Sequence, residues 1–344
     1  MGMFLSSLAL SVFMSSSITL ETDKDLHIFS NTRKMIASNG AILVMTPFEL
    51  YHWDSTGRLV GRYGLGGKVS EPNFLSTFHY DSRQEIIWLI YTNPPHSYFF
   101  DKKGKVIGEG FLEDDSGKEK PAYYRDLLSV GSRVFAQENT GTGSWGGSQK
   151  QIIQLVDYEI TGSGVRITHQ GKPFGKFSEL QAEYQYDFKK HWLVQNGLTK
   201  NFSLVNQLDN HLQWFHSLED ASIEQGLVTS GPPRKIYLPD WTPPPTLKLN
   251  QVKPGPNDYH LFSQITGAFP WDDQSLIVGY TLPNPADPKD LAFGIQRYKF
   301  DGTVEGKPLK EKGLFLGVHN RQVYALQTMG EKGSKIYRVK IFGW

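Results

Sequence analysis

Hydrophobic and polar residues alternate in short runs along most of this chain, and turn-forming residues separate the runs. The alternation has a period of two, which is typical of β-strands because successive side chains point to opposite faces. In the first clear unit the pattern predicts strands over residues 34–38, 41–46, 49–54 and 58–63. Runs of this length joined by Gly, Asn, Asp and Ser indicate an all-β chain built from hairpins.

The turn between the third and fourth strands of this unit recurs along the chain. Residues 53–61 read Trp-Asp-Ser-Thr-Gly-Arg-Leu-Val-Gly, and residues 100–108 read Phe-Asp-Lys-Lys-Gly-Lys-Val-Ile-Gly. A shortened copy, Phe-Asp-Gly-Thr-Val-Glu-Gly, occupies residues 300–306. Gly suits the turn because a tight hairpin needs positive φ, and the Asp side chain can bond to the backbone of its own turn. A repeat at a spacing of 47 residues, built from four short strands, is the signature of a β-propeller.

The same pattern of four strands, named a to d in chain order, predicts further units after the first. They are expected at 75–110, 126–169, 184–216 and 261–307. In the fourth unit, strand a is expected at 184–188 and strand b at 191–195.

A sixth unit, over residues 313–342, has only three predicted strands. Residues 18–21 or 26–30, near the N-terminus, are expected to supply its strand d, because closing a ring removes exposed sheet edges. The sequence therefore predicts a six-bladed β-propeller of four-stranded antiparallel blades, with the last blade closed by an N-terminal strand. A seventh blade would have to come from the stretch between Asp209 and Asp301. That stretch contains the Pro-rich residues 232–256, and proline does not suit central strands.

The domain organisation follows from the same pattern. We expect residues 18–344 to form a single propeller domain with a Pro-rich insertion at about 226–258. Residues 1–17 read as a signal peptide or an N-terminal tail, because the apolar stretch at 4–14 has the length of a signal-peptide core and Ser17 offers a small residue for cleavage. No Lys or Arg precedes that stretch, so the basic start of a signal is missing. The expected location is secreted or periplasmic.

A family resemblance adds to this interpretation over about residues 48–111. The run Tyr63-Gly64-Leu65-Gly66-Gly67, the later Tyr80-Asp81 and the segment from Phe99 to Gly104 resemble an NHL-type repeat. NHL and TolB-like proteins form six-bladed propellers, so the resemblance implies the same ring. The chain departs from the family where an Asn-Arg pair usually follows strand b, because residues 93–96 read Asn-Pro-Pro-His.

Composition narrows the classes of partner. Hydrophobic residues make up 39% of the 344 residues and aromatic residues 13%, which is enough for a large core. The 36 basic and 35 acidic residues give a net charge of +1, so we expect no nucleic-acid partner. The apolar stretch at 4–14 is too short to span a bilayer, and no integral membrane span is expected. The chain has no Cys, which excludes disulfides, cysteine nucleophiles and thiolate metal sites.

Loop lengths indicate which face of the ring would bind a partner. Strands of a blade run alternately up and down, so b–c and d–a connections share one face, and a–b and c–d turns share the other. The long connections, at 110–125, 138–150, 217–260 and 282–291, all fall on the first face, here called the loop-rich face. Long loops gathered on one side are common carriers of binding.

The candidate binding residues belong mostly to this face. Glu138, Asn139 and Trp145 come from a Gly-rich b–c loop in which the indole could stack on a planar or sugar-like partner. The others follow predicted b strands or lie in the insertion: Asn93, His96, Asn196, Tyr280 and Trp241. The alternative is that strand ends are polar because they meet water, and that the Trp and Tyr residues are packing anchors.

The sequence therefore favours a non-catalytic binding or scaffold propeller, acting as a monomer, that recognises a protein, peptide or glycan through the loop-rich face. No catalytic or metal-ligating residue is assigned and no cofactor is indicated. The alternative is a calcium-type hydrolase, lactonase or lyase, as occurs among six-bladed relatives. In that case Glu138, Asn139 and Asn196 at the channel mouth would hold the metal.

Overall fold

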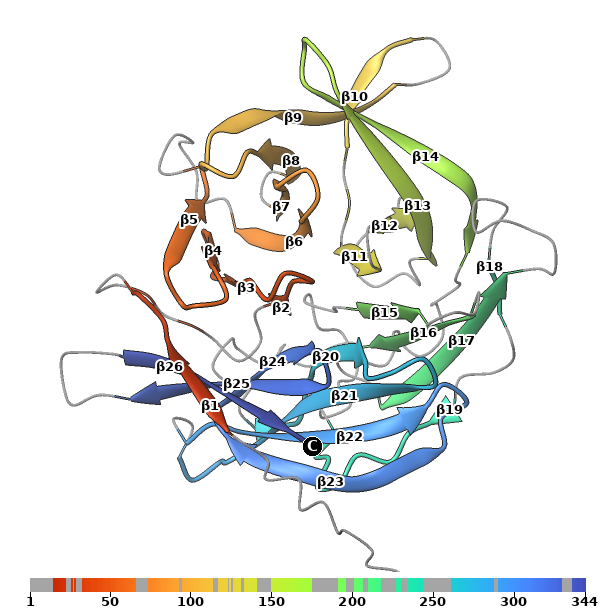
Figure 1. Ribbon diagram of the computed structural model, residues 1–344. Coiled ribbons are helices and arrows are strands. Elements are labelled where there is room, and N and C mark those ends of the chain that lie inside the picture. The colour runs from red at the N-terminus through yellow and green to blue at the C-terminus, as the bar shows by residue number, and fades with distance from the viewer. Residues whose placement is uncertain are drawn as a thin grey trace, which may run out of the picture.

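The computed structural model describes residues 15–22, 26, 28, 33–65, 74–92, 95–113, 117–122, 124, 126–130, 133–140, 150–174, 191–195, 201–206, 210–217, 227–229, 234–243, 261–287, 290–329 and 336–344. The regular secondary structure of the described residues consists of strands β1 to β26. They form an all-β, propeller-like arrangement in which four-stranded antiparallel sheets surround a common centre (Figure 1).

Hydrogen bonds join the strands into five sheets. The first contains β2 (Lys34–Ile36), β3 (Ile42–Met45), β4 (Leu50–Trp53) and β5 (Leu59–Tyr63). Another contains β20 (Ile265–Pro270), β21 (Ser275–Leu282), β22 (Ala292–Lys299) and β23 (Val304–Lys312). A third contains β24 (Leu314–His319), β25 (Gln322–Met329), β26 (Ile336–Gly343) and β1 (Ser16–Thr19). Each lies close to the ranges expected from the alternation.

The largest sheet has nine strands and consists of two antiparallel runs. One run is β6 (Leu75–Asp81), β7 (Ile86–Thr92), β8 (Pro95–Phe100) and β9 (Val106–Glu113), with β10 (Glu119–Pro121) beside β9. The other is β11 (Asp126–Val130), β12 (Arg133–Thr140), β13 (Lys150–Ile160) and β14 (Val165–Phe174). Only a short parallel pairing joins them, between residues 110–112 of β9 and 165–167 of β14. Gly108 and Gly164 permit this approach, because a Cβ on Gly108 would lie 2.8 Å from the Cα of Gly164.

The remaining sheet is β15 (His191–Gln195), β16 (Asn201–Asn206), β17 (His211–Ser217), β18 (Leu227–Thr229) and β19 (Arg234–Lys235). β18 and β19 pair with opposite ends of β17, so two short pieces share the outer position. Both belong to the stretch expected to be an insertion. Residues Ile236 and Leu238, which follow β19, are buried in a core cluster with residues of β20 and β21.

This sheet corrects the strand assignment of the fourth unit. The sequence assigned His191–Gln195 to strand b, whereas β15 is the first strand of its sheet and contacts the inner strands β11 and β20. The expected strand a at 184–188 lies outside the described residues. Strands a and b of a blade are both covered on both faces, so either is expected to be apolar. The apolar pattern of residues 191–195 therefore cannot distinguish strand a from strand b.

Contacts between neighbouring sheets run around a ring, which is closed by the contact of β6 with β3, the second strand of the first sheet. β6 contacts β11, β11 contacts β15, β15 contacts β20, β20 contacts β24 and β24 contacts β2, while β6 also meets β3. The core lies between neighbouring sheets, where Trp53, Tyr63 and Trp88 are fully buried. The predicted turns are present as well. Asp54 Oδ1 accepts hydrogen bonds from the backbone N–H groups of Thr56 and Arg58, at 2.9 and 3.1 Å.

The N-terminal strand completes the last sheet, as expected. β1 pairs antiparallel with β26, with Ser16 opposite Ile341 and Thr19 opposite Arg338. The sequence left two candidates for this strand, residues 18–21 and 26–30. The strand corresponds to the first of them and begins two residues earlier, at Ser16. Leu26, in the second segment, is buried and its carbonyl accepts a hydrogen bond from the hydroxyl of Tyr337.

Candidate ligand cavity

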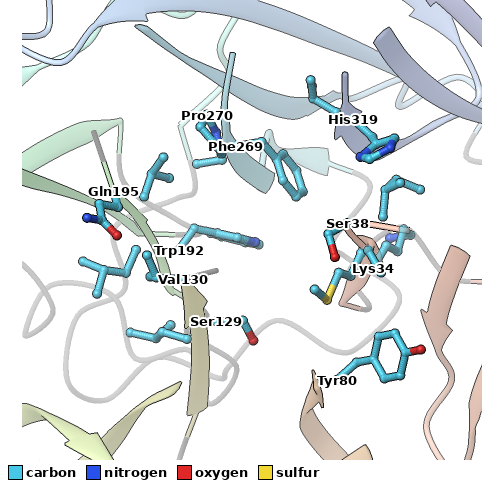
Figure 2. Close-up of a pocket in the computed structure, with 18 of the residues that line it drawn as sticks. Lys34, Ser38, Tyr80, Ser129, Val130, Trp192, Gln195, Phe269, Pro270 and His319 are labelled. Atoms are coloured by element: carbon cyan, nitrogen blue, oxygen red, sulfur yellow. The ribbon is translucent and has the colours of Figure 1, made fainter. Parts of the chain in front are cut away.

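A cavity of about 780 Å³ lies at the centre of the ring. Its walls come from the inner strands β2, β6, β11, β15, β20 and β24 and from the turns that follow several of them (Figure 2). The volume falls within the range of small-molecule sites. The cavity exists because the inner strands converge on one axis and their alternating side chains leave part of that space open.

Two aromatic rings project into this space. The rings of Trp192 on β15 and Phe269 on β20 point into the cavity from different sheets (Figure 2). The guanidinium of Arg33 lies 6.0 Å from the centre of the indole ring, which fixes Trp192 by a cation–π contact. Phe269 packs edge-on against Phe315 with ring centres 5.6 Å apart. Both rings are therefore held in place by neighbouring side chains.

Arg33 also crosses the axis at one end of the cavity. It precedes β2, and its guanidinium reaches the first residues of two other inner strands. Its Nη2 lies 2.7 Å from Asp126 Oδ2 and donates to the carbonyl of His191 at 3.1 Å, while Nη1 donates to the carbonyl of Leu127. The carboxylate of Asp126 accepts two further hydrogen bonds, from the backbone N–H groups of Leu127 and His191. This buried ion pair forms the floor of the cavity at the starts of the inner strands.

The other end of the cavity is lined by the turns between the first and second strands of the sheets. Ser38 and Ser82 bond to each other there, with 3.1 Å between hydroxyl oxygens. Arg83 and Arg321 lie in the same rim, and both are exposed. These turns belong to the face opposite the loop-rich face, because strand starts and strand ends lie on opposite sides of the ring.

The turn that carries Arg321 is strained. Asn320 and Arg321 join β24 to β25 with φ values of 49° and 56°, a type I′ hairpin geometry that favours Gly at the second position. An L-residue with a long side chain pays about 1 kcal/mol in this region. Strain of this kind often accompanies a functional position.

Replacing Arg321 by Gly is therefore expected to raise the free energy of unfolding by about 1 kcal/mol. Urea unfolding of the purified protein measures the change, and Arg321→Ala, which keeps the strain, is the matched control. Equal stability of the Gly and Ala variants would contradict this account of the turn.

His79 lies behind the cavity wall between β6 and β11. Its Nδ1 is 2.7 Å from the hydroxyl oxygen of Ser129, which lines the cavity. Burial lowers the pKa of His79 to about 4, although nearby Asp81 opposes the shift. The ring is neutral at physiological pH and a weak base, which does not suit activation of Ser129 as a nucleophile. The pair joins two inner strands and has a structural role.

The lowered pKa predicts acid sensitivity. Because the pKa of His79 is lower when folded, about 4, than its reference value of 6.5, the unfolded chain binds a proton that the folded chain rejects between these values. The stability that neutral His79 contributes is complete above about pH 6.5 and is lost as the pH falls toward 4, at up to about 1.4 kcal/mol per pH unit.

The variant His79→Asn keeps a polar atom near the position of Nδ1 and removes the titration. The free energy of unfolding should therefore decrease less between pH 7 and pH 5 for this variant than for the wild type. His52, whose pKa burial also lowers, is present in both proteins and does not affect the difference. Parallel pH profiles would contradict the assignment.

The described candidates from the sequence do not gather at this cavity. His96 forms a 2.7 Å contact through Nδ1 with Glu109 Oε1, on β8 and β9. Tyr280 is fully buried and its hydroxyl donates to the carbonyl of Pro239, so it is a core residue and does not face a ligand. Trp241 packs edge-on against Tyr280 and is partly buried. Tyr280 and Trp241 therefore fit the alternative interpretation from the sequence, in which such residues are packing anchors.

The other candidates are only partly within the described structure. Glu138 and Asn139 lie on β12, whose described backbone pairs them with residues 151 and 152 of β13. Asn93, Trp145 and Asn196 lie outside the described residues. Asn196 follows β15, which is an inner strand, so its expected place among the ends of b strands is wrong. Gln195 at the end of β15 instead lines the cavity on the side opposite the loop-rich face.

Sequence reasoning missed the residues that shape the cavity, chiefly Arg33, Trp192 and Phe269. They are far apart in the chain and share only a position on an inner strand. An aromatic residue on an inner strand is the available signal, and the wrong assignment of 191–195 to strand b concealed it for Trp192. In the part of the chain that the structure describes, no three His, Asp or Glu side chains come together as metal ligands. Nor does a helix there have the length and apolar character to cross a membrane.

Comparisons with known proteins show the fold. No model of a protein family matches the chain, and no curated protein does. Among solved structures the chain is similar to a "putative exported protein" of Bacteroides fragilis, with a TM-score of 0.52 and 11% identity over 97% of this chain and 96% of that one. It is also similar to a member of the DUF4221 family from Bacteroides vulgatus, with a TM-score of 0.50 and 12% identity over 96% and 98%. The β-propeller domain of Cps50 (Swd1) from Myceliophteria thermophila gives a TM-score of 0.41 at 10% identity, over 96% and 100%.

Proposed function

We propose that the chain is a six-bladed propeller of the NHL or TolB-like type. Six four-stranded antiparallel runs result when the nine-stranded sheet is divided at its parallel pairing of β9 with β14, which involves three residues of each strand. The series of contacts that links the six inner strands, closed by β6 against β3, supports the same count. On this proposal residues 18–344 are one domain, and the Pro-rich stretch at about 226–258 is inserted in the fourth blade.

The function that the geometry supports best is non-catalytic binding of a ligand in the central cavity by a monomeric protein. The observation that carries this proposal is a cavity of about 780 Å³ that combines aromatic walls with a polar rim. It is large enough for a sugar, a peptide end or a similar small group. The partner could present such a group as part of a peptide or glycan.

Occlusion of the cavity mouth tests this function. Ser38 is exposed and lines the rim, so Ser38→Trp should fill the mouth at little cost to the fold. Thermal shift and calorimetry are run with monosaccharides, tripeptides, phenylpropionate, phenylpropanol and phenylpropylamine. We expect at least one compound to bind the wild type and not Ser38→Trp. Binding that Ser38→Trp leaves unchanged, or no binding by any compound, would refute a role for the cavity.

The loop-rich face is the second place where a partner could contact the protein. Its Gly-rich loop, residues 141–147 with Trp145, lies outside the described structure. Replacement of 141–147 by a short linker should leave binding in the cavity intact. A compound lost from the linker variant and retained by Ser38→Trp would assign recognition to the loop-rich face.

Export from the cytoplasm is part of the proposal. It rests on the apolar stretch at residues 4–14 and on the description of the Bacteroides fragilis structure as an exported protein. Cleavage after Ser17 would remove two of the four residues of β1. N-terminal sequencing of the protein from its native source tests export, and a mature N-terminus beyond Thr19 would argue against β1 as part of the final fold.

A further inference from the structure

The cavity offers a hydrogen-bond donor, the indole N–H of Trp192, that has no partner among the described residues. The side chain of Trp192 is buried except for 8% of its surface, and no described residue accepts a hydrogen bond from its indole N–H. Figure 2 shows the indole nitrogen at the end of the ring that faces the open space. Because this nitrogen faces the open space, its N–H can donate to a molecule in the cavity. The natural partner is an acceptor atom on a ligand.

Two cationic groups at the rim also have no partner in the described part of the chain. Among the described residues, none forms a hydrogen bond or ion pair with the guanidinium groups of Arg83 and Arg321. They come from the turns after β6 and β24, which lie on either side of the first sheet around the ring. Arginine presents a fork of N–H donors that matches a carboxylate.

Two acidic groups of the lining, Asp81 and Asp272, already accept hydrogen bonds from the protein. Asp81 accepts hydrogen bonds from the hydroxyl of Tyr158 at 2.9 Å and from the backbone of Arg83 at 2.8 Å. Asp272 accepts from the hydroxyl of Ser275 at 2.7 Å and from a backbone N–H at 2.9 Å. Asp273 is exposed at the rim. Asp81 and Asp272 therefore have fewer acceptor sites left for a ligand, and Asp273 is the exposed acceptor beside the donors of the rim.

We propose that the cavity binds an organic acid, with a carboxylate carried on an aromatic or ring-shaped body. The body lies between the rings of Trp192 and Phe269, and the carboxylate accepts the indole N–H and meets Arg83 and Arg321. This inference rests on the proposed function, since it assigns a chemical class to the same cavity.

Matched compounds isolate the role of charge. Phenylpropionate, phenylpropanol and phenylpropylamine share a ring and a linker and differ in the terminal group, and galacturonate with galactose repeats the comparison on a sugar ring. Isothermal titration calorimetry should show at least one acid binding at least tenfold more tightly than its neutral counterpart, and more weakly as the salt concentration rises. The two series show whether an aromatic or a sugar body is preferred.

Matched variants isolate the donors. Trp192→Phe keeps an aromatic ring and removes the N–H, so it should weaken binding of the acid about tenfold, the value of one hydrogen bond to a charged group. Arg83→Gln and Arg321→Gln should weaken the acid and leave the alcohol unchanged. Lys103→Gln removes the same charge from a c–d turn on the same face, away from the cavity, and should have no effect.

The outcomes separate the ligand class from the proposed function. If the alcohol or the amine binds as tightly as the acid and Ser38→Trp abolishes that binding, the cavity is a binding site but the organic-acid assignment is wrong. The assignment is also wrong if Trp192→Phe and the Arg variants bind the acid as the wild type does. If no compound binds in a manner sensitive to Ser38→Trp, both proposals fail.

Discussion

Replacing Arg33 by Met is expected to lower the free energy of unfolding by about 3–5 kcal/mol, the usual cost of removing one partner of a buried ion pair. The side chains of Arg33 and Asp126 expose only 8% and 2% of their surface. Met has a similar volume but no charge, so Asp126 would remain buried with two backbone donors and no cation. Urea unfolding by fluorescence and circular dichroism measures the loss.

A second ion pair provides the control. Arg62 and Glu49 lie at the same 2.7 Å separation but expose 43% and 27% of their side-chain surface. Solvent screens such pairs, and Arg62→Met should cost no more than about 1 kcal/mol. The double variant Arg33→Met with Asp126→Leu should recover much of the lost stability, because it removes the uncompensated carboxylate. If Arg33→Met costs as little as Arg62→Met, then Arg33 does not hold the inner strands together.

This ion pair illustrates what the sequence could predict. Alternation identifies strands because it is local, and the Asp-x-x-Gly turns are local as well, so β2 to β9 lie close to their expected ranges. Arg33 and Asp126 are 93 residues apart, and nothing in either neighbourhood indicates that they meet. Their contact depends on how the sheets close around the axis, which a single sequence does not specify at the level of side chains.

The candidate residues from the sequence and the cavity lie in different places for a related reason. The sequence correctly distinguished two faces by the direction of strands, but it located binding by loop length. The cavity is formed instead by inward side chains such as Trp192 and Phe269 and by short turns on the other face. The wrong strand assignment in the fourth unit also had a consequence for the site. Because His191–Gln195 was assigned to strand b, its residues were placed at the wrong end of the ring, although the apolar pattern itself was identified correctly.

Removal of β1 is expected to have the largest effect of all. Deleting residues 1–21 removes Leu20, which exposes only 3% of its surface, and the partly buried Ile18. It also removes the carbonyl of Glu21, which accepts a hydrogen bond from the indole N–H of buried Trp53 at 2.6 Å. Loss of apolar burial at roughly 1.5–3 kcal/mol per large side chain, with an orphaned Trp53 donor at about 1–3 kcal/mol, should destabilise the fold by roughly 5 kcal/mol.

The deletion should also change the state of association, because the edge of β26 would become free to pair with another chain. Size-exclusion chromatography with light scattering should show oligomers of the deletion variant, and chemical denaturation should give its reduced stability. A chain that begins at Ser15 retains β1 and should unfold as the full-length protein does. A synthetic peptide of residues 15–22, added in excess, should restore the monomer and its stability by taking the place of β1. A deletion variant that stays monomeric and equally stable would show that pairing of the two chain ends does not hold the ring closed.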